Sequence, residues 1–371
     1  MLFVDGISIF LACADHLRSG FWIFRQPKAA QIEDGLRLKL KGIHMTHRIR
    51  IRSAIKSCIA SLFFAASTAG AQASFPAKPV TLVVPYGAGS TTDLYARILA
   101  EGLTSELKQA VVVENRPGAG GTVGIGQALR AEPDGHTLML VTSSSIAING
   151  SLYTSLPFDP AKDVSVIAVL NTTPNALIVP ASAKETNFAQ FAQRIQSGKH
   201  FYFSQGSGTS QHLSNVLLGR VLKADLEHVP YRGQEGIAGM LGGQTEFGFA
   251  SLPSILTLAK GGKLRILAVS GSKPVPSMPD IPTLASLGYK DFAAGEVWYG
   301  VGVSAATPAT VKEQLSAALD KVAEKPEIRA KLNQAGFEPV APMTAAQRQA
   351  FVDQQVEFWG RLVRESGAKV D

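Results

Sequence analysis

The chain alternates short apolar runs with amphipathic stretches from residue 80 onward. Runs rich in β-branched residues occupy 80–85, 110–115 and 136–143, and helical patterns begin at about Thr91 and Thr122 between them. Continuous apolar strands that are separated by helices are typical of a parallel sheet whose two faces are covered. This part of the chain is therefore predicted to form an α/β unit.

A second series of elements with a similar plan follows the polar, proline-rich passage at 155–163. Strands are expected at 164–170, 175–180, 200–205, 226–231 and 245–251, with one helix from about Ser210 and another at Gly236–Leu241. The residues after 306 form amphipathic patterns, and Thr307 and Thr344 are expected to cap two helices there. The sequence thus predicts two successive α/β units.

The first 73 residues follow a different pattern. From Met45, a basic segment leads into an apolar run that ends in Ala71-Gln72-Ala73. This order of charge, apolar core and A-x-A site is typical of a bacterial secretory signal peptide, and the apolar core is too short for a comfortable membrane anchor. We expect residues 45–73 to be a signal peptide, the mature chain to begin at Ser74 in the periplasm, and residues 1–44 to be a mis-assigned upstream extension.

The basic balance of the whole chain, a net charge of +7, resides mostly in that leader. Residues 1–73 contain ten of the 36 Lys and Arg and four of the 29 Asp and Glu, which leaves 26 basic and 25 acidic side chains. A nearly neutral mature chain gives little support for nucleic-acid binding. Both cysteines, Cys13 and Cys58, also lie in the leader, so the mature protein has no disulfide and no cysteine metal site.

The glycine-rich loop "GAGSTTD" at 87–93 lies between a predicted strand and a predicted helix. The first N–H groups of that helix would point into the loop, with about half a positive charge from the helix dipole. Glycines let an anion approach the main chain and hydroxyls add donors. Because the loop has no lysine, it is not a P-loop. The candidate anion-binding residues are Gly87, Gly89, Ser90, Thr91 and Thr92.

The loop "FSQGSGTSQHLSN" at 203–215 repeats this arrangement in the second unit, with two glycines among hydroxyl side chains. Two helix N-termini, one from each unit, would thus face each other across a cleft and hold one anion. A further glycine cluster at 118–124 only loosely imitates a dinucleotide fingerprint and is interpreted as a tight turn. We therefore expect no cofactor.

An exported serine hydrolase is the alternative function, because Ser207 could use His212 or His228 as a base. The G-x-S-x-G pattern of a nucleophile elbow fails, since Gln205 stands where the first glycine should be. Serines at a helix start are more often caps than nucleophiles. The four histidines of the mature chain show no H-x-x-x-H pairing, so no metal site is expected.

Several longer stretches together resemble one family. They are "VPYGAGSTTDLYARILAEGL", "VVVENRPGAGGTVGIGQALRAEPDGHTLML", "SQGSGTSQHL" and "HVPYRGQEGIAGMLGGQTEFGFASLPS". From about Phe75 to the C-terminus the chain resembles the Bug-type solute receptors, the extracytoplasmic component of tripartite tricarboxylate transporters. The resemblance implies a monomeric periplasmic receptor rather than an enzyme, which captures a small organic carboxylate and delivers it to membrane permease subunits.

The resemblance also implies the fold: an α/β, two-lobed periplasmic binding protein of the type II-like flytrap kind. Each lobe would be a mostly parallel sheet flanked by helices, and crossing strands would join the lobes. Lobe 1 is expected at 74–173 and 270–371 and lobe 2 at 174–269, with the return crossing as late as 296 as an alternative.

In such receptors, main-chain N–H groups of two facing loops grip the carboxylate, and a third loop with Ser143, Ser144 and Ser145 borders the cleft. The site residues that the resemblance implies are Tyr86, Gly87, Ala88, Gly89, Ser90, Thr91, Thr92, Ser143, Ser144, Ser204, Gly206, Ser207, Gly208, Thr209, Ser210 and His212.

This chain departs from the family's usual motifs at two places near the expected cleft. Ser90 stands where members commonly have a second glycine, and Ala250-Ser251 stands where many have Asp-Asn. The ligand is therefore expected to differ from that of a typical member. Trp298 and Tyr299 would either form an aromatic wall of the pocket or pack in the core.

Overall fold

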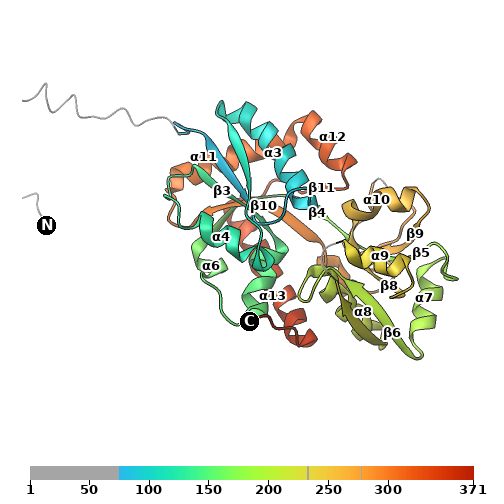
Figure 1. Cartoon of the computed structure of the whole chain (residues 1–371). Coiled ribbons are helices and arrows are strands. Elements are labelled where there is room, and N and C mark those ends of the chain that lie inside the picture. The colour runs from blue at the N-terminus through green and yellow to red at the C-terminus, as the bar shows by residue number, and fades with distance from the viewer. Residues whose placement is uncertain (1–74, 232–233, 277) are drawn as a thin grey trace, which may run out of the picture. The chain divides into compact units, whose positions relative to one another are not determined.

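The computed structural model describes residues 75–231, 234–276 and 278–371, and these residues belong to one structural unit. Two β-sheets, each flanked by helices, make up this unit (Figure 1). The two-lobed α/β fold that the sequence indicates is therefore confirmed. The signal peptide expected at 45–73 and the extension expected at 1–44 lie outside the described residues.

The first sheet, which defines lobe 1, has six strands in the order β11-β4-β10-β3-β1-β2. Its central strands are apolar because helices cover both faces, and Val80, Leu82 and Val84 are fully buried. The elements of this lobe are β1 (Val80–Val84), α3 (Thr91–Leu107), β2 (Val111–Asn115), α4 (Thr122–Ala128), β3 (Thr137–Thr142), η3 (Ser143–Ile148), α5 (Asn149–Leu152), α6 (Pro160–Asp163), β4 (Val164–Thr173), β10 (Val297–Ser304), α11 (Ala309–Glu324), α12 (Pro326–Gln334) and β11 (Glu338–Pro339).

The second sheet, which defines lobe 2, has five strands in the order β7-β6-β8-β5-β9. Its core includes the fully buried rings of Phe203, Phe247 and Phe249. The elements of this lobe are β5 (Asn175–Pro180), α7 (Phe188–Ile195), β6 (Lys199–Ser204), α8 (Ser210–Leu222), β7 (Asp225–Pro230), α9 (Glu235–Leu241), β8 (Phe247–Ser251), α10 (Leu252–Lys260) and β9 (Leu264–Val269).

Both sheets are mixed, which corrects the expectation of mostly parallel sheets. The pairs β1–β2, β1–β3, β6–β7 and β6–β8 are parallel, whereas β10 runs antiparallel to β3 and β4, and β5 runs antiparallel to β8 and β9. The cause is the double crossing between the lobes. A chain that leaves one lobe through β4 and returns through β10 places an outgoing strand beside a returning one, and such neighbours are antiparallel.

The two crossings lie side by side. The first is at Pro174, between β4 and β5, and the second precedes β10, where Val297 pairs with Thr173. Residues after β9 still pack on lobe 2, because Val275 and Leu284 belong to its apolar clusters and Thr283 bridges to Val269. By these contacts, the chain returns to lobe 1 close to residue 296 rather than at 270.

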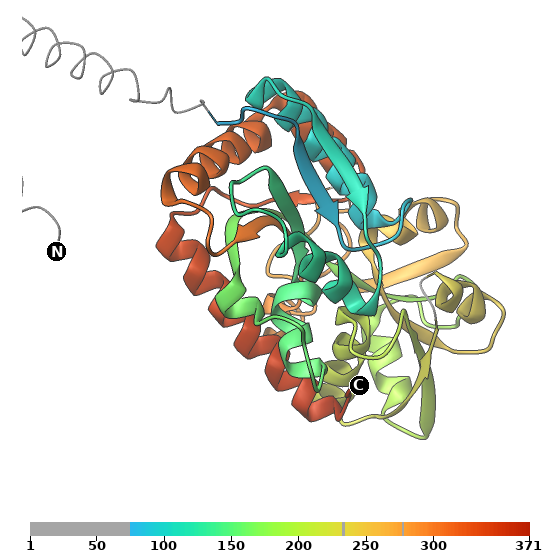
Figure 2. The same ribbon diagram turned by 60° about the vertical axis from the view of Figure 1, so that its left-hand side comes forward.

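The C-terminal helix α13 (Ala345–Ser366) packs on β4 of lobe 1 and on α8 of lobe 2, and Figure 2 shows it as the long red helix along one edge. Its apolar residues Phe358, Trp359 and Leu362 share one buried cluster with Leu152 of lobe 1 and Leu217 of lobe 2. The start of α8 is thus packed against lobe 1, and this contact fixes where the loop before α8 lies.

The tail helices confirm one predicted cap and correct the other. Thr344 caps α13 as expected, with a capping box to Gln347. Thr307 is buried and does not cap α11, because Pro308 takes the N-cap position and its carbonyl accepts hydrogen bonds from the N–H groups of Val311 and Lys312. Within the described residues, no helix is long and apolar enough to cross a membrane.

Candidate functional site

A cavity of about 380 Å³ lies where the two lobes meet. Lobe 1 contributes the loop after β1 and the ends of β3 and β10, and lobe 2 contributes the loop after β6 and the starts of α8 and α10. None of its lining residues is charged within the described part of the chain; they are Tyr86, Gly87, Gly89, Ser90, Thr91, Thr92, Thr142, Ser144, Gln205, Thr209, Ser210, Gln211, Gln234, Ser251, Ser254, Val297 and Tyr299.

In lobe 1, a buried carboxylate fixes the loop that turns from β1 into α3. Ser90 caps α3 by accepting a hydrogen bond from the Asp93 N–H at 3.2 Å, and Asp93 Oδ2 accepts from the Gly89 N–H at 2.9 Å. Arg97 and Asn115 also donate to Asp93, at 3.0 and 2.9 Å. Burial raises the pKa of the Asp93 carboxyl, but these hydrogen bonds outweigh it, so its pKa lies below the usual value.

In lobe 2, the loop that turns from β6 into α8 is held by a histidine at the equivalent position. Thr209 caps α8 by accepting a hydrogen bond from the His212 N–H at 3.3 Å, and it donates to the Gly206 carbonyl at 2.8 Å. His212 Nδ1 in turn accepts from the Gly208 N–H at 3.1 Å. Each loop therefore has a residue that caps the helix and, three residues after that cap, a side chain that accepts a hydrogen bond from the glycine before the cap.

The first N–H groups of both helices have no hydrogen-bond acceptor among the described residues. The third and fourth N–H groups of each helix donate to the capping residue, as those of Asp93 and Leu94 do to Ser90. Within the described residues, no protein acceptor is recorded for the main-chain N–H of Thr91, Thr92, Ser210 or Gln211. All four residues line the one cavity, so the positive ends of two helix dipoles meet there.

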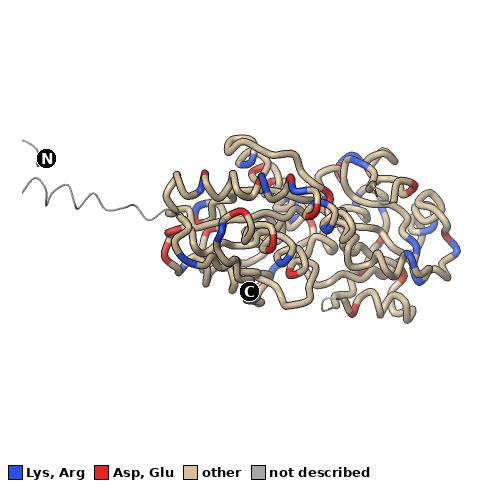
Figure 3. Tube along the Cα trace, turned by 90° about the horizontal axis from the view of Figure 1, so that it is seen from above, with Lys and Arg blue, Asp and Glu red and all other residues tan. Residues whose placement is uncertain are grey.

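An arrangement of this kind can bind an anion without a cationic side chain, because helix N-termini supply both the donors and the positive potential. Charged residues are interspersed over both lobes rather than gathered in one basic patch (Figure 3).

The model of the tripartite tricarboxylate transporter family receptor matches residues 95–368. The chain belongs to this receptor family.

Individual relatives agree with the family match. The receptor is 30% identical to the protein BugT of Bordetella pertussis over 301 residues, which cover 80% of this chain and 92% of BugT. It is 30% identical to the periplasmic binding protein BugD, whose structure superimposes with a TM-score of 0.70 over 80% of this chain and 99% of BugD. The structure of R. palustris Rpa4515 with adipate gives a TM-score of 0.72 at 27% identity, over 80% of this chain and 100% of that one. The chain is a solute-binding receptor, and its family consists of periplasmic binding proteins.

The receptor's cavity brings together nine of the residues expected at the site. They come from three loops of different parts of the chain: Tyr86, Gly87, Gly89, Ser90, Thr91, Thr92, Ser144, Thr209 and Ser210. Tyr86 donates to or accepts from Thr142 through its hydroxyl at 3.1 Å, which ties the first loop to the third. The Gly89 N–H, however, is already bound to Asp93 and is not a free donor.

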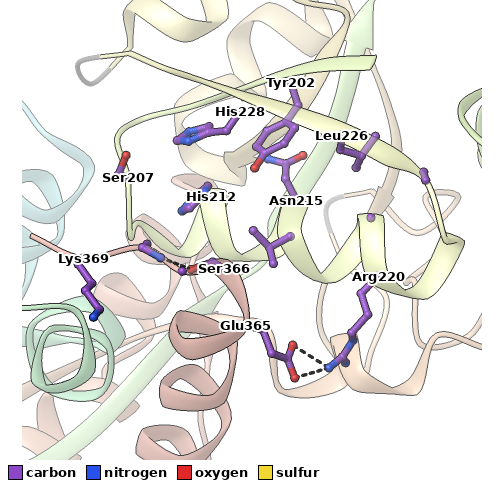
Figure 4. A pocket seen from close by; sticks show the side chains of 15 residues that line it. Tyr202, Ser207, His212, Asn215, Arg220, Leu226, His228, Glu365, Ser366 and Lys369 are labelled. Carbon is purple, nitrogen blue, oxygen red and sulfur yellow. Dashed lines mark hydrogen bonds and ion pairs between the residues drawn. The ribbon is translucent and has the colours of Figure 1, made fainter. Parts of the chain in front are cut away.

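Seven expected residues do not line this cavity. Ala88 is exposed, and Ser143 is fully buried at the start of η3. The other five belong to the loop before α8 or to the elements next to it, and Gly206 and Gly208 in this loop have positive φ angles. Ser207 and His212 line a second, larger cavity of about 610 Å³ (Figure 4). These five residues are Ser204, Gly206, Ser207, Gly208 and His212.

Sequence reasoning missed several polar residues of the cavity. Gln205 and Gln211 lie within the predicted loop at 203–215, so the loop motif itself was the available signal. Ser254, in the first turn of α10, was also missed. Ser251, just before α10, was expected near the cleft but not among the site residues, and its Oγ is buried with no hydrogen-bond partner among the described residues. The remaining missed residues are Thr142, Gln234 and Val297.

The two neighbouring aromatic residues of β10 point to opposite faces of the sheet, as strand geometry requires. Tyr299 lines the cavity and packs against Tyr95 and Phe337 with ring centroids 5.0 and 5.1 Å away. Burial raises the pKa of the Tyr299 phenol well above its usual value, although Ser251 and Thr92 near the hydroxyl act in the opposite direction. Trp298 is fully buried in a separate apolar cluster.

The serine and histidine residues of the receptor are not arranged for hydrolysis at Ser207. The imidazole of His228 is bound to Ser204 Oγ at 2.6 Å, and Ser204 is fully buried. Within the described residues, Ser207 makes no hydrogen bond to an imidazole, and no group of three or more His, Cys, Asp or Glu could hold a metal ion. The site thus gives no support to the hydrolase alternative.

Proposed function

We propose that this receptor, as a monomer, captures a small organic carboxylate in the cavity of about 380 Å³ and delivers it to membrane permease subunits of a tripartite tricarboxylate transporter. The observation that supports this most is the meeting of two helix N-termini, whose N–H groups at Thr91, Thr92, Ser210 and Gln211 have no recorded protein acceptor. The adipate in the R. palustris relative is a ligand of the size and charge that this cavity suits.

The expected affinity follows from the number of donors. Each charge-assisted hydrogen bond contributes on the order of 1.5–3 kcal/mol. Three or four such bonds, less the free energy of association and lobe closure, give roughly −8 kcal/mol, which corresponds to a Kd of about 1 μM. Uncharged side chains around the carboxylate, such as Gln205, Gln211 and Tyr299, would then select the rest of the ligand by hydrogen bonding and shape.

The test is direct binding by the protein expressed from the full chain. Thermal unfolding is recorded with adipate, succinate, citrate, glutamate and benzoate, and titration calorimetry follows for each acid that raises the Tm. We expect at least one acid to bind with a Kd in the micromolar range and the matching primary amide to bind much more weakly. Failure of every acid, or equal binding of acid and amide, would contradict the proposal.

Export to the periplasm is part of the same proposal, because the leader at 45–73 has the pattern of a signal peptide. Expression in a Gram-negative host should place the protein in the periplasmic fraction, with Ser74 as its N-terminal residue. A cytoplasmic product that retains residues 45–73 would contradict this part and leave the binding proposal intact.

A further inference from the structure

The loop before α8 lies between two cavities, and different residues of the loop line each of them. Gln205, Thr209 and Ser210 face the ligand cavity, whereas Ser207 and His212 face the cavity of about 610 Å³ behind it. Figure 4 shows this rear cavity, with the labelled His212 and His228 side chains close together beneath the loop. The residues on the back of the loop therefore do not contact a ligand in the front cavity, yet they hold the segment that does.

His212 makes two hydrogen bonds that fix this segment. Its main-chain N–H donates to Thr209 Oγ1 at 3.3 Å, and its ring nitrogen Nδ1 accepts from the main-chain N–H of Gly208 at 3.1 Å. A side chain at the third helical position that accepts from a residue before the helix closes the same kind of ring as a capping box. The Gly208 N–H is thereby occupied, as is that of Thr209, which donates to the Gly206 carbonyl, and the following residues, Ser210 and Gln211, line the ligand cavity.

The surroundings of His212 keep its ring neutral and in one orientation. The ring stacks on that of His228 with centroids 4.0 Å apart, and His228 is bound to Ser204 at 2.6 Å. Burial, together with the neighbouring His228, lowers the pKa of His212 to about 3. A neutral ring that accepts at Nδ1 carries its proton on Nε2, so the acceptor that Gly208 needs is present.

The opposite side of the loop is closed by lobe 1. A Cβ atom at Gly208 would lie only 2.2 Å from Leu152 Cδ2, so Leu152 is pressed against the backbone at this point. The Gly208 peptide is thus held between the imidazole of His212 in lobe 2 and the side chain of Leu152 in lobe 1.

We propose that His212 is a positioning residue for carboxylate binding. Its Nδ1 accepts a hydrogen bond from the Gly208 N–H and thereby holds the loop so that the free N–H groups of Ser210 and Gln211 face the ligand cavity. This inference rests on the proposed carboxylate function and concerns a residue that does not itself touch the ligand.

The experiment compares three substitutions in the full chain. His212→Asn keeps an acceptor where Nδ1 lies, His212→Gln moves the same amide one methylene further, and His212→Leu removes the acceptor. Val216→Ala, one turn later on α8 and lining the same rear cavity, is the matched control for lost volume. Kd is measured with whichever of adipate, succinate, citrate, glutamate and benzoate binds the unmodified receptor.

We expect His212→Leu and His212→Gln to raise Kd by about tenfold, which is what loss of one well-placed hydrogen bond supplies. His212→Asn and Val216→Ala should bind within about twofold of the unmodified protein. Equal Kd values for the Asn and Gln variants would overturn the proposal, and the Gln variant decides the matter should the Leu variant not fold.

Hydrogen exchange tests the same inference without any ligand. The amide of Gly208 should exchange about tenfold faster in His212→Gln than in His212→Asn, while amides in the middle of α8 remain unchanged. Equal exchange at Gly208 would overturn the proposal. A receptor that binds none of the acids but shows this difference would contradict the proposed function and leave the positioning role of His212 intact.

Discussion

The two loops that meet at the ligand cavity are built alike and differ in one residue type. In both, a glycine with a φ of +77° or +75° precedes the cap residue, Ser90 or Thr209. In both, the glycine N–H is bound by the side chain three residues beyond the cap, which is ionised Asp93 in lobe 1 and neutral His212 in lobe 2.

This difference changes the positive potential that each helix N-terminus presents to the cavity. A carboxylate at the third helical position stabilises the helix, but its negative charge also offsets the dipole that a ligand would use. Arg97, four residues after Asp93, compensates part of that charge, whereas Val216 stands at the corresponding place after His212. The N-terminus of α8 therefore keeps its full positive potential for an anion, whereas Asp93 offsets part of the potential at the N-terminus of α3.

The largest expected effect concerns the two glycines. Both have a left-handed φ, so either substitution by alanine introduces backbone strain. A Cβ at Gly208 would also clash with Leu152 at 2.2 Å, whereas no atom lies within 4 Å of a Cβ at Gly89. We expect Gly208→Ala to lower the free energy of unfolding by about 3 kcal/mol and Gly89→Ala by about 1 kcal/mol, measured by urea denaturation. Equal losses would show that the loops are not packed as described.

The second effect is the pH dependence of stability. The pKa values of His212 and His228 are lowered by burial to about 3 and about 4, so between pH 6.5 and about 4 the unfolded chain binds more protons than the folded one. These two residues contribute stability that is present above pH 6.5 and is lost as the pH falls. His212→Asn removes one of the two groups and should reduce the loss from pH 6.5 to pH 4.5 by on the order of 2 kcal/mol.

One other buried group would obscure that measurement and is best removed. Burial raises the pKa of the Glu296 carboxyl to about 7, so Glu296 contributes stability that is present at pH 4.5 and is lost as the pH rises to 7. Its slope is opposite to that of the histidines. The comparison is therefore made between Glu296→Gln and the double variant Glu296→Gln, His212→Asn; identical slopes for these two proteins would contradict the neutral state of His212.

The third effect tests the carboxylate of lobe 1. Asp93→Asn keeps an oxygen acceptor for the Gly89 N–H but loses the charged hydrogen bond from Arg97. We expect a loss of about 1–2 kcal/mol in the free energy of unfolding at pH 7. Because the pKa of Asp93 is lowered in the folded protein, this difference should shrink as the pH falls. Ligand affinity should not decrease; a large rise in Kd would show that the negative charge is needed at the site.

The smallest expected effects are those of the caps. Ser90→Ala and Thr209→Ala each remove the acceptor for one helix N–H and should lower the free energy of unfolding by about 1 kcal/mol, with closely similar values. A difference of more than about 1 kcal/mol between them would break the equivalence of the two loops.

Much of the fold follows from local patterns in the sequence. Apolar runs bounded by prolines and glycines predict β5 at 175–180, and glycine-rich loops followed by hydroxyl residues place the helix starts at Thr91 and Ser210. These signals are local, because a cap and the first helical residue are neighbours in sequence. Sheet direction is not local, so the antiparallel pairing of β10 with β4 did not follow from periodicity.

The candidate site was predictable only to the level of its loops. Hydroxyl and glycine content identifies the loop at 204–210, but it does not tell that Gln205 lines the cavity of about 380 Å³ and Ser207 the cavity of about 610 Å³. Ser254 reaches the cavity from a helix of lobe 2 that carries no anion-binding pattern. Which face of a loop is used depends on packing from the other lobe, such as that of Leu152, and no short stretch of sequence encodes it.

The most direct test of the account is a crystal structure of the receptor with the carboxylic acid that raises its Tm most. We predict carboxylate oxygens at about 2.7–3.2 Å from main-chain nitrogens at the starts of both α3 and α8, among Thr91, Thr92, Ser210 and Gln211. A carboxylate bound in the rear cavity beside His212 and Lys369, or held in the front cavity by side chains alone, would contradict the account.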